Sequence, residues 1–558
     1  MQTVPGSSNR RGAPALASVA VLALAACSAA AAGAPPAPRT AAAKGPAATY
    51  PELLTLFADW RAAQRAPLVG GVPDYSPAAI ASQGEQLARL RQRLLAFEIK
   101  RWPVSQQVEW HVLRAELNGL EFDHRVLRPW AENPAFYLTV FDEKSDQPAR
   151  EGPFAQGALE LWKFKLPLDA AAAKSITEGL STIPALLAQA KTNLTGDRHD
   201  CWVWGGKMLR GQEQLLRALE KDAGPQGAAV VAASVKAREA TAALAGWVEE
   251  QGKLKTAPSG IGVDNYDWYA ANVQLLPWGH RDQTVLMERE LARSKAALAF
   301  EEQRNKALPA LLPVASAEEY ARRFPAAVKR YLELLRQHEV MTVKPYFEPA
   351  LLAEVGSYTP KRPLEFFAEV DYRAPMILRT HGYHWLDLAM MEKEPHHSAI
   401  RRGALLYNLF DTRTEGLATA MEELMMNAGL FEGRERELIY LLVAQRAARA
   451  LGELQLQANQ LDLDGAAKFA STNTPRGWLR LDGRTVWFEQ QLYLAQPGYG
   501  TSYLTGKLLF DQLIAARRDA EGEGFTLKRL FDELNGAGLI PAPLVLWELG
   551  GVLPGFAR

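Results

Sequence analysis

The chain has 558 residues, and its 63 basic and 63 acidic residues give a net charge of zero at neutral pH. A neutral chain has no electrostatic attraction for nucleic acid or for an anionic membrane surface, so charge excludes nucleic acid as a partner. The composition is ordinary for a globular protein, and the roughly 510 residues after the N-terminal segments are enough for a large core or two domains.

The segment 1–27 combines a basic pair with a short apolar core. Arg10 and Arg11 precede the apolar run 13–26, which leads into Leu24-Ala25-Ala26-Cys27. Such a run is too short to span a bilayer comfortably and is typical of an export signal. The last four residues resemble a bacterial lipobox, in which the cysteine becomes the lipidated first residue of the mature protein. We therefore predict lipidation at Cys27; cleavage at a later small residue is the alternative.

Residues 28–48 consist mainly of Ala, Gly and Pro. They lack the apolar side chains that would offset the entropy of ordering, so we expect a flexible tether. The membrane is then contacted through the lipid anchor only. Ser28 resembles the residue that permits transport to the outer membrane in proteobacterial lipoproteins, so we expect an exported protein on the periplasmic side of that membrane. With Cys27 lipidated, Cys201 has no partner for a disulfide.

Helical periodicity dominates the first half of the chain. Apolar residues recur at three- and four-residue intervals in the ranges 85–100, 102–128, 171–193, 211–221 and 227–253. The clearest break is 253–263, which contains Pro258-Ser259-Gly260. It predicts a boundary between an N-terminal helical subdomain, 49–258, and a C-terminal helical subdomain, 259–558, that carries the site.

The second half begins with a predicted amphipathic helix over 280–306. The next helix opens at Ser316 with a capping-box pattern, in which Glu319 is the acidic member. Pro325 lies inside this helix and should kink it or begin a second segment. The range 344–371 mixes prolines with aromatic residues, and we expect a short strand or an irregular substrate-facing loop there.

The last third contains another predicted helix over 434–459. The range 478–487 includes Asp482-Gly483 and predicts a turn between short extended pieces. A loop rich in Gly and Tyr follows over 496–503 and runs into a helix from about residue 504. Such a loop lets backbone and phenol groups, including Tyr499, approach a ligand closely; a tight turn packed by tyrosine rings is the alternative.

Histidines and carboxylates are concentrated between residues 379 and 423. His381, His384 and Asp387 recur every three residues on one predicted helix, and Glu415 lies in the first turn of a helix that begins near residue 412 or 414. Two imidazoles and one carboxylate on facing helices are typical of a zinc site. Gly382 occupies the place where zinc peptidases carry the general base. The alternative is a pair of partly buried histidines that hydrogen-bond to nearby carboxylates.

Arginines on the helix over 434–459 are further candidates. Arg446 and Arg449 lie near Glu453, an arrangement that is most often a structural salt bridge. A role of Arg449 in gripping a substrate carboxylate is the other interpretation.

Several motifs resemble a bacterial family, the domain of unknown function 885 (DUF885). In chain order they are the region 269–309 with Glu288-Arg289-Glu290-Leu291, then Thr414-Glu415-Gly416-Leu417-Ala418, Gln445-Arg446-Ala447-Ala448-Arg449, Gln496-Pro497-Gly498 with Ser502-Tyr503, and the ending 526–549. The resemblance implies an all-helical fold related to the zincin metallopeptidases and zinc-dependent cleavage of peptides. Family members carry a His-Glu pair, a later His after a Pro-Gly step, and a Glu-Gly-Trp-Ala element with the third ligand.

The sequence matches this family pattern only in part. Glu415 matches the family Glu, whereas Leu417 replaces the Trp. If Gly382 is aligned with the family Gly, the His-Glu pair falls on Ile377-Leu378 and the next His on Tyr383. A shift of one residue keeps His384 as a ligand, and Gln457 takes the place of a further His.

We therefore expect an all-α fold with a few short strands or loops around a cleft. The predicted zinc ligands are His381, His384 and Glu415. Glu415, Tyr503 and Asp387 are predicted to be catalytic, and Arg449, Arg413 and Tyr499 to bind a peptide or small-molecule substrate. Arg449 and Tyr503 match the family and would bind substrate or stabilise an oxyanion. The alternative function is that of a catalytically inactive pseudoenzyme that binds a peptide or a partner.

Overall fold

The computed structural model describes residues 48–557, apart from 224–226 and 360–361. The predicted lipidation site Cys27 and the predicted tether, up to residue 47, lie outside the described residues. Those described belong to a single unit by their internal contacts. Within this part of the chain, no helix is long and apolar enough to cross a membrane.

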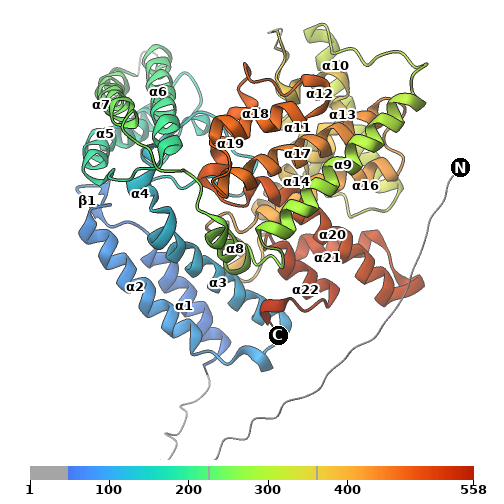
Figure 1. The fold of residues 1–558 in the computed structure, drawn as a ribbon, viewed down its shortest axis with the longest axis horizontal. Coiled ribbons are helices and arrows are strands. Elements are labelled where there is room, and N and C mark those ends of the chain that lie inside the picture. The colour runs from blue at the N-terminus through green and yellow to red at the C-terminus, as the bar shows by residue number, and fades with distance from the viewer. Residues whose placement is uncertain (1–47, 224–226, 360–361, 558) are drawn as a thin grey trace, which may run out of the picture. The chain divides into compact units, whose positions relative to one another are not determined.

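The first half of the described chain is built from helices and two very small sheets (Figure 1). Strand β1 (Leu68–Val69) pairs antiparallel with β2 (Val72–Pro73), and β3 (Val140–Phe141) pairs parallel with β4 (Leu159–Glu160). Helices α5, α6 and α7 pack against one another as a group. The helices of this half are α1 (Tyr50–Ala63), α2 (Pro77–Leu95), α3 (Val104–Phe122), α4 (Pro129–Glu132), α5 (Ala170–Asn193), α6 (His199–Asp222) and α7 (Ala228–Gly252).

The second half is helical throughout its regular elements, and the predicted all-α fold is confirmed. Its helices are α8 (Val263–Asn272), α9 (His280–Arg304), α10 (Ala317–Gln337), α11 (Phe347–Ala353), α12 (Phe366–Arg373), α13 (Pro375–His381), α14 (Tyr383–Lys393), α15 (Ala399–Arg402), α16 (Asp411–Asn427), α17 (Glu435–Gln457), α18 (Leu463–Asn473), α19 (Thr485–Ala495), α20 (Tyr499–Glu521), α21 (Leu527–Gly536) and α22 (Ala542–Gly550).

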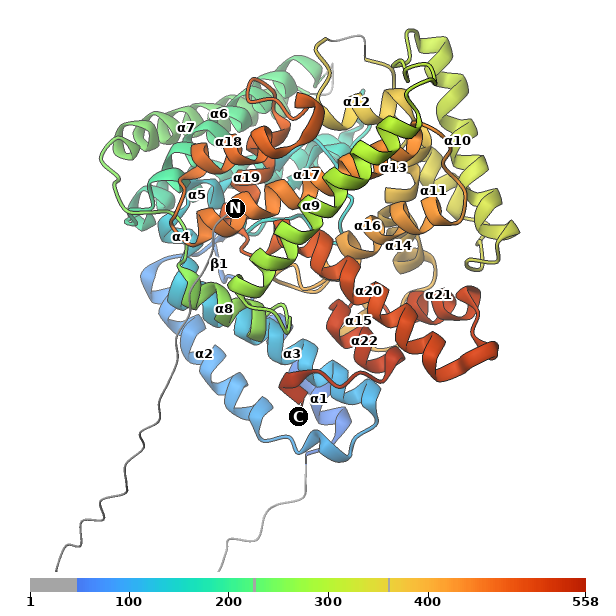
Figure 2. The same cartoon turned by 45° about the vertical axis from the view of Figure 1, so that its right-hand side comes forward.

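Helix α17 is the most deeply buried long helix of the second half. It packs against α9, α18, α19 and α20, as Figure 2 shows, and nearly all of its residues are buried. A helix covered on all sides must carry apolar residues all round, and any polar side chain it buries must find a partner. The buried arginines and glutamates of α17 therefore pair with neighbouring helices, and this arrangement reaches the candidate site.

Helices α16 and α20 approach each other unusually closely. A Cβ atom added to Gly416 would lie 2.5 Å from the Cα of Gly506, and one added to Gly506 would collide with the carbonyl oxygen of Thr412. Only glycine permits this contact. It fixes α16 against α20 next to Glu415, so the pair of glycines positions the carboxylate.

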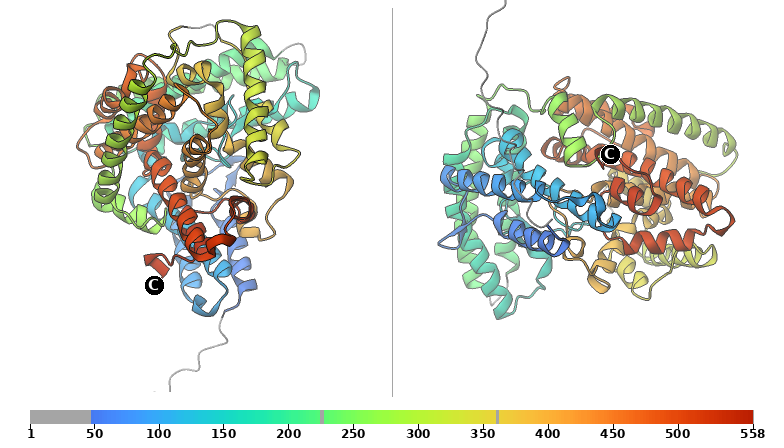
Figure 3. Two further views of the ribbon diagram at one scale, coloured as in Figure 1. Left: turned by 90° about the vertical axis from the view of Figure 1, so that its right-hand side faces the viewer. Right: turned by 90° about the horizontal axis from the view of Figure 1, so that it is seen from below.

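The buried apolar residues form two main groups. The larger group combines residues of α1–α3 with residues of α8–α22, and the smaller one lies within 66–248. Helix α3 contacts α22 near the C-terminal end of the chain (Figure 3). The N-terminal helices thus share a core with the last ones, while the predicted boundary at residue 258 stays a prediction.

The strongest sequence periodicities gave helices close to their predicted bounds. The helices predicted over 171–193, 227–253, 280–306 and 434–459 correspond to α5, α7, α9 and α17. Ser316 caps α10 as predicted, because its hydroxyl accepts a hydrogen bond from the Glu319 N–H at 3.2 Å. Helix α2 already ends at Leu95, and α6 begins at His199, well before the predicted start at 211.

Three local predictions were met only in part. Pro325 begins no second segment, because α10 continues from Ala317 to Gln337 and buries residues on both sides of the proline. In 344–371 no strand forms among the described residues, where α11 and α12 form, but the described residues between these two helices are irregular, as the alternative predicted. The turn predicted in 478–487 forms and leads directly into α19, but no extended pieces flank it.

Helix α20 also begins earlier than predicted, at Tyr499 instead of residue 504. Gly498 adopts a positive φ of 85°, which is accessible to glycine and ends the preceding loop. The buried carboxylate of Glu453 accepts hydrogen bonds from the N–H groups of Gly498 and Thr501 at the start of the helix. This acceptor satisfies the free N–H groups of the first turn, so the tyrosines lie on a helix and not in a loop.

Candidate metal centre

The two histidines of the central segment lie on consecutive helices, not on one. Helix α13 ends at His381 and α14 begins at Tyr383, so the single predicted helix is wrong. A Cβ atom at Gly382 would lie 3.1 Å from the Arg379 carbonyl oxygen and 3.2 Å from Leu351 on α11, so there is little room for a side chain. The break brings the rings of His381 and His384 to a centroid distance of 4.9 Å.

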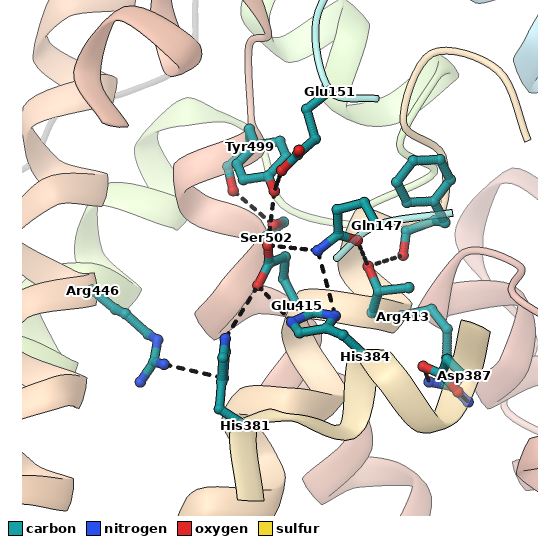
Figure 4. Close-up of polar contacts among 12 residues, drawn as sticks. Gln147, Glu151, His381, His384, Asp387, Arg413, Glu415, Arg446, Tyr499 and Ser502 are labelled. Carbon is teal, nitrogen blue, oxygen red and sulfur yellow. Dashed lines mark hydrogen bonds and ion pairs between the residues drawn. The ribbon is translucent and has the colours of Figure 1, made fainter. Parts of the chain in front are cut away.

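The structure brings the three predicted ligands together (Figure 4). The Nε2 atoms of His384 and His381 lie 3.4 Å and 3.9 Å from Oε2 of Glu415. One ligand atom from each residue lies within 4.8 Å of the other two. His384 and Glu415 are 2% and 3% exposed, whereas His381 is partly exposed. His384 Nε2 and Glu415 Oε2 form no hydrogen bond with any described residue, although both are buried.

The second nitrogen of His381 and the second carboxylate oxygen of Glu415 each contact a supporting residue. His381 Nδ1 lies 3.2 Å from Oε1 of Glu422, which in turn forms a two-pronged ion pair with Arg446 at 2.6 Å and 2.7 Å. Glu415 Oε1 accepts hydrogen bonds from Gln147 Nε2 at 2.9 Å and from the Tyr499 hydroxyl at 2.7 Å. Supporting contacts of this kind orient metal ligands in proteins.

Gln147 also contacts His384, the remaining candidate ligand. Gln147 Nε2 lies 3.4 Å from His384 Nδ1, and the Thr414 hydroxyl donates to Gln147 Oε1 at 2.6 Å. Gln147 therefore touches two of the three candidate ligands. It fixes His384 so that Nε2 faces Glu415.

The charges of the cluster are strongly coupled. Burial alone would lower the pKa of His384, but Glu415 and other carboxylates raise it to about 9. Burial would raise the pKa of Glu415, but His384 and His381 lower it to about 2. For His381, burial lowers the pKa and outweighs the opposing effect of Glu422. Glu415 is thus ionised and His381 neutral at neutral pH, which are the forms that bind a cation. His384 carries a proton at neutral pH and pairs with Glu415 at 3.4 Å, so a metal ion would have to displace that proton.

The donor set fits a divalent metal ion. Zinc binds imidazole nitrogen and carboxylate oxygen at about 2.0–2.2 Å, so tetrahedral ligand atoms lie about 3.3 Å apart. The separations of 3.4 Å and 3.9 Å from Glu415 Oε2 approach this spacing. Three protein ligands also leave a fourth position open, as in catalytic zinc sites.

Asp387 and Arg413 form a separate ion pair beside the cluster. The guanidinium donates to both carboxylate oxygens of Asp387 at 3.0 Å and 3.1 Å, and both residues are buried. The predicted catalytic role of Asp387 and the predicted substrate-binding role of Arg413 stay predictions. In the described contacts, each residue is the other's partner.

Arg449 and Tyr503 lie next to each other, and Arg449 is bound to α19. Arg449 is ion-paired with Glu489, and its Cζ lies 4.1 Å from the centre of the Tyr503 ring. The charge of Glu415 contributes to a raised pKa of Tyr503, after the larger effect of burial. Arg446, one helical turn earlier on α17, is the arginine that reaches the cluster. Only Tyr499, of the three predicted substrate-binding residues, hydrogen-bonds to a candidate ligand.

Gln147 and Glu151 were missed by the sequence interpretation. Both lie in the irregular segment between β3 and β4, which has no periodicity and is more than 200 residues from the histidines. The Tyr499 hydroxyl hydrogen-bonds to Glu151 as well as to Glu415. Burial raises the pKa of Glu151 to about 7, and the charge of Asp146 adds to the shift. No sequence signal marked either residue.

The positions where the family pattern would place other ligands are structural here. Ile377 is fully buried in the core, and the Tyr383 hydroxyl donates to Asn535 at 2.7 Å. Gln457 donates to the carbonyl oxygen of Tyr493 at 2.8 Å and accepts from the N–H of Ile261 at 3.2 Å. These side chains tie helices together and face no part of the cluster.

Comparison with known proteins gives a family and a fold. One solved structure, of a "putative lipoprotein of unknown function" from Shewanella oneidensis, is 16% identical with a TM-score of 0.61, over 89% of this chain and 99% of that one. Another, of a "putative lipoprotein" from Colwellia psychrerythraea, is 14% identical with a TM-score of 0.65, over 90% of this chain and 97% of that one. At these identities the similarity concerns the fold alone. No curated protein sequence matches the chain.

The family match covers the C-terminal part of the chain. Residues 384–547 match the family described as "Bacterial protein of unknown function (DUF885)". The matched segment includes His384 and Glu415 and begins three residues after His381. The match assigns this segment of the chain to the DUF885 family, which confirms the family that the sequence motifs predicted.

Proposed function

We propose that the protein is a metal-dependent hydrolase of the cell envelope that cleaves peptides at the cluster of His381, His384 and Glu415. The observation that carries the proposal is the convergence of His384 Nε2 and Glu415 Oε2, which are buried, 3.4 Å apart and without a hydrogen bond to any described residue. Buried polar atoms usually have hydrogen-bond partners, so this pair of atoms beside the third donor, His381, supports the proposal of a bound cation.

Zinc is the metal that this donor set favours. His381 and His384 would hold it through Nε2, and Glu415 through Oε2. A bound zinc ion supplies Lewis-acid activation of water or of a substrate carbonyl group. Glu422 can accept a hydrogen bond from Nδ1 of His381 and keep that imidazole ring in place. The amide of Gln147 lies 3.4 Å from Nδ1 of His384 and packs beside that ring.

Proton transfer is assigned to Glu151 with Tyr499. The Tyr499 hydroxyl contacts the carboxyl groups of both Glu151 and Glu415, so it links Glu151 to the cluster by hydrogen bonds. A carboxyl group with a pKa of about 7 can accept a proton from water and return it to a leaving amine at neutral pH. Glu151 would thus act as the general base, which zinc peptidases carry at the position that Gly382 occupies here. Tyr503 keeps its predicted role of binding substrate or stabilising an oxyanion, and the Arg449 guanidinium lies against its ring.

A second function is favoured by a different observation. Asp387 and Glu422 are the carboxylates next to the histidines, and each is held by an arginine through both oxygens. Neither is free to act as a base in these contacts. If Glu151 does not replace them, the protein is a pseudoenzyme that binds a peptide or a partner without cleaving it.

Anchoring at the envelope is part of the proposal. It is supported by the lipobox-like sequence that ends at Cys27 and by the description of two proteins of similar fold as lipoproteins. The periplasmic side of the outer membrane is the expected location. Replacement of Cys27 by Ser should release the protein from the membrane fraction, and retention of this variant in that fraction would contradict the anchor.

Metal content tests the centre itself. We expect residues 48–558, purified without chelator and supplied with zinc, to hold about one zinc ion per chain. The His384→Ala variant should hold none, and variant His397→Ala, which removes an exposed histidine, should match the parent. Equal zinc in parent and His384→Ala would disprove the centre.

Cleavage separates the two functions. The parent should cleave members of a peptide library, and both Glu415→Gln and chelator should abolish cleavage. Glu151→Gln should reduce the rate while leaving the zinc content unchanged. Peptide binding that persists in the presence of chelator, without any cleavage, would support the pseudoenzyme instead.

A further inference from the structure

A second candidate site lies in a cavity that none of the three candidate ligands lines. The cavity has a volume of about 280 Å³ and is bounded by α3, the turn after α3, α8 and loops near residues 150, 407 and 496. Its aromatic lining residues are Tyr75, Trp130, Phe136, Phe154, Tyr269 and Tyr407. A concave apolar surface with a few polar groups is typical of a small-molecule site.

Asp123 supplies the charge in this cavity. It is the first residue of the π-helical turn Asp123–Leu127 that follows α3. Its carboxylate has no hydrogen bond or ion pair with any described residue, and burial raises its pKa to about 8. Glu116, on the same helix, shows the usual arrangement, because it accepts from Trp60 and pairs with Arg61. Asp123 is partly exposed and lines the cavity, so its carboxyl group can bind a ligand there without first losing a protein partner.

Two tyrosine hydroxyls accompany Asp123. Neither Tyr269 nor Tyr407 donates a hydrogen bond to a described residue, and both line the cavity. Burial raises the pKa of both phenols, and the nearby Asp123 charge raises it further. The cavity therefore brings three oxygen-bearing groups together without a protein partner for any of them.

The cation that lines the same cavity is directed elsewhere. Arg150 donates to the carbonyl oxygen of Glu143 at 2.6 Å, and its Cζ lies 4.1 Å from the ring centre of Phe141. Among the described residues no ion pair joins Arg150 to Asp123, although both line the cavity, and the buried Nε of Arg150 has no hydrogen-bond partner there. The charge of Asp123 is thus left without a counter-charge from Arg150.

The backbone around Asp123 is irregular at several places. Tyr407 and Asn408 both line the cavity and have positive φ angles of 56° and 51°, which are strained for residues other than glycine. Any side chain at Gly119 on α3 would collide with the Tyr407 ring, so the glycine lets that ring lie against the helix. Strained residues and π-helical turns persist mostly where function requires them.

We propose that this cavity binds a small primary ammonium compound that carries an apolar group. A bound ammonium group would favour the ionised form of Asp123, so that one carboxylate balances one positive charge, and the three oxygen-bearing groups match the three N–H donors of a primary ammonium. The aromatic walls cover the apolar group and attract the cation through their ring faces. A hard metal ion needs six or more oxygen ligands and would be poorly served by this set. The inference does not depend on the metal centre.

Calorimetric titration of the purified protein with three matched probes tests the proposal. Benzylamine carries the ammonium, benzyl alcohol lacks the charge, and benzyltrimethylammonium keeps the charge but lacks N–H donors. We expect benzylamine to bind at least about tenfold more tightly than either of the others, because only it makes charge-assisted hydrogen bonds. Comparable binding of benzyl alcohol, or no binding of benzylamine at millimolar concentration, would overturn the proposal.

Single-residue variants test whether benzylamine binds in this cavity. Asp123→Asn should weaken benzylamine binding by at least about tenfold and leave binding of benzyl alcohol unchanged. The control Glu178→Gln removes an exposed carboxylate of α5 and should bind benzylamine like the parent. Tyr269→Phe removes one acceptor and should weaken benzylamine binding severalfold even if Asp123→Asn does not fold. Unchanged affinity in a folded Asp123→Asn or Tyr269→Phe variant would contradict the assigned site.

Discussion

Helices α14 and α16 face each other at two polar contacts that use the same kinds of atoms differently. At one contact, Arg413 donates to both oxygens of Asp387. At the other, His384 Nε2 and Glu415 Oε2 are 3.4 Å apart and form no hydrogen bond. The two contacts lie on the same helices, three residues apart on α14 and two residues apart on α16.

The difference between them is whether the acceptor atoms are satisfied. The Asp387–Arg413 contact is complete, so it can contribute to stability but has no free acceptor for a ligand. The His384–Glu415 contact is incomplete, and supporting residues such as Gln147 and Glu422 hold its rings with the free atoms facing inward. Sequence spacing cannot distinguish these cases, because each contact joins a residue of α14 to a residue of α16 and the sequence does not show which atoms meet.

Removal of one partner from the complete contact should have the largest effect. Arg413→Ala leaves the buried Asp387 charge unpaired, and the free energy of unfolding should fall by about 3–5 kcal/mol. Urea denaturation measures it. Arg217→Ala, at an exposed pair on α6, should change it by about 0.5 kcal/mol or less. The double variant Asp387→Leu with Arg413→Met should recover most of the loss, and a loss as large as that of Arg413→Ala would contradict this account.

Metal should stabilise the incomplete contact by a somewhat smaller amount. With free zinc at about 100 times its dissociation constant, the free energy of unfolding should rise by about 2.7 kcal/mol, because zinc binds the folded chain. Chelator should reverse the gain, and His384→Ala should show none. The double variant of Asp387 and Arg413 should still respond to zinc. If it did not, the two contacts would not be independent.

Loss of a supporting contact should weaken the metal without abolishing it. Glu422→Gln removes the charge next to His381 Nδ1, and zinc affinity should fall by about 10- to 100-fold. Competition with a chromogenic chelator measures this. Glu423→Gln is the matched control, since Glu423 pairs with Arg293 and Lys507 instead and should leave zinc affinity unchanged. Equal losses in both variants would point to a general disturbance of α16.

The smallest expected effect is on the pH dependence of stability, and it comes from His111, a buried histidine without a carboxylate partner among the described residues. Burial, followed by the charge of Arg114, lowers the pKa of His111 to about 3, whereas the value in the unfolded chain is near 6.5. Its contribution to stability is therefore present above about pH 6.5 and is lost as the pH falls toward 3, because only the unfolded chain takes up the proton. Between about pH 6.5 and 5.5 the loss should be about 1 kcal/mol.

His111→Phe measures that contribution by comparison. The parent should lose about 1 kcal/mol more than the variant over this pH interval, as followed by urea denaturation. For each protein, the change in the free energy of unfolding is taken relative to its own value at neutral pH. A packing change caused by the phenylalanine therefore cancels in the comparison. An identical pH dependence in both proteins would show that His111 does not titrate in the unfolding reaction.

The candidate ligands could be predicted because their chemistry is local. His381, His384 and Glu415 were identified from residue type and spacing, although the helix that was expected to carry both histidines is broken at Gly382. Gln147 and Glu151 could not be predicted, since they lie in an aperiodic segment whose position depends on the packing of other elements. Asp123 lies in the predicted helical range 102–128 and was missed because its lack of a hydrogen-bond partner is not visible in its own neighbourhood of sequence.

The sequence by itself determined the helical class, the bounds of α5, α7, α9 and α17, and the residues that can act as metal ligands. Those properties follow from periodicity and side-chain chemistry, which act over a few residues. The tertiary structure alone decided which polar atoms are satisfied: Arg413 completes Asp387, while Glu415 and Asp123 keep free oxygens. Satisfaction depends on partners tens to hundreds of residues away, and only packing brings these within hydrogen-bonding distance.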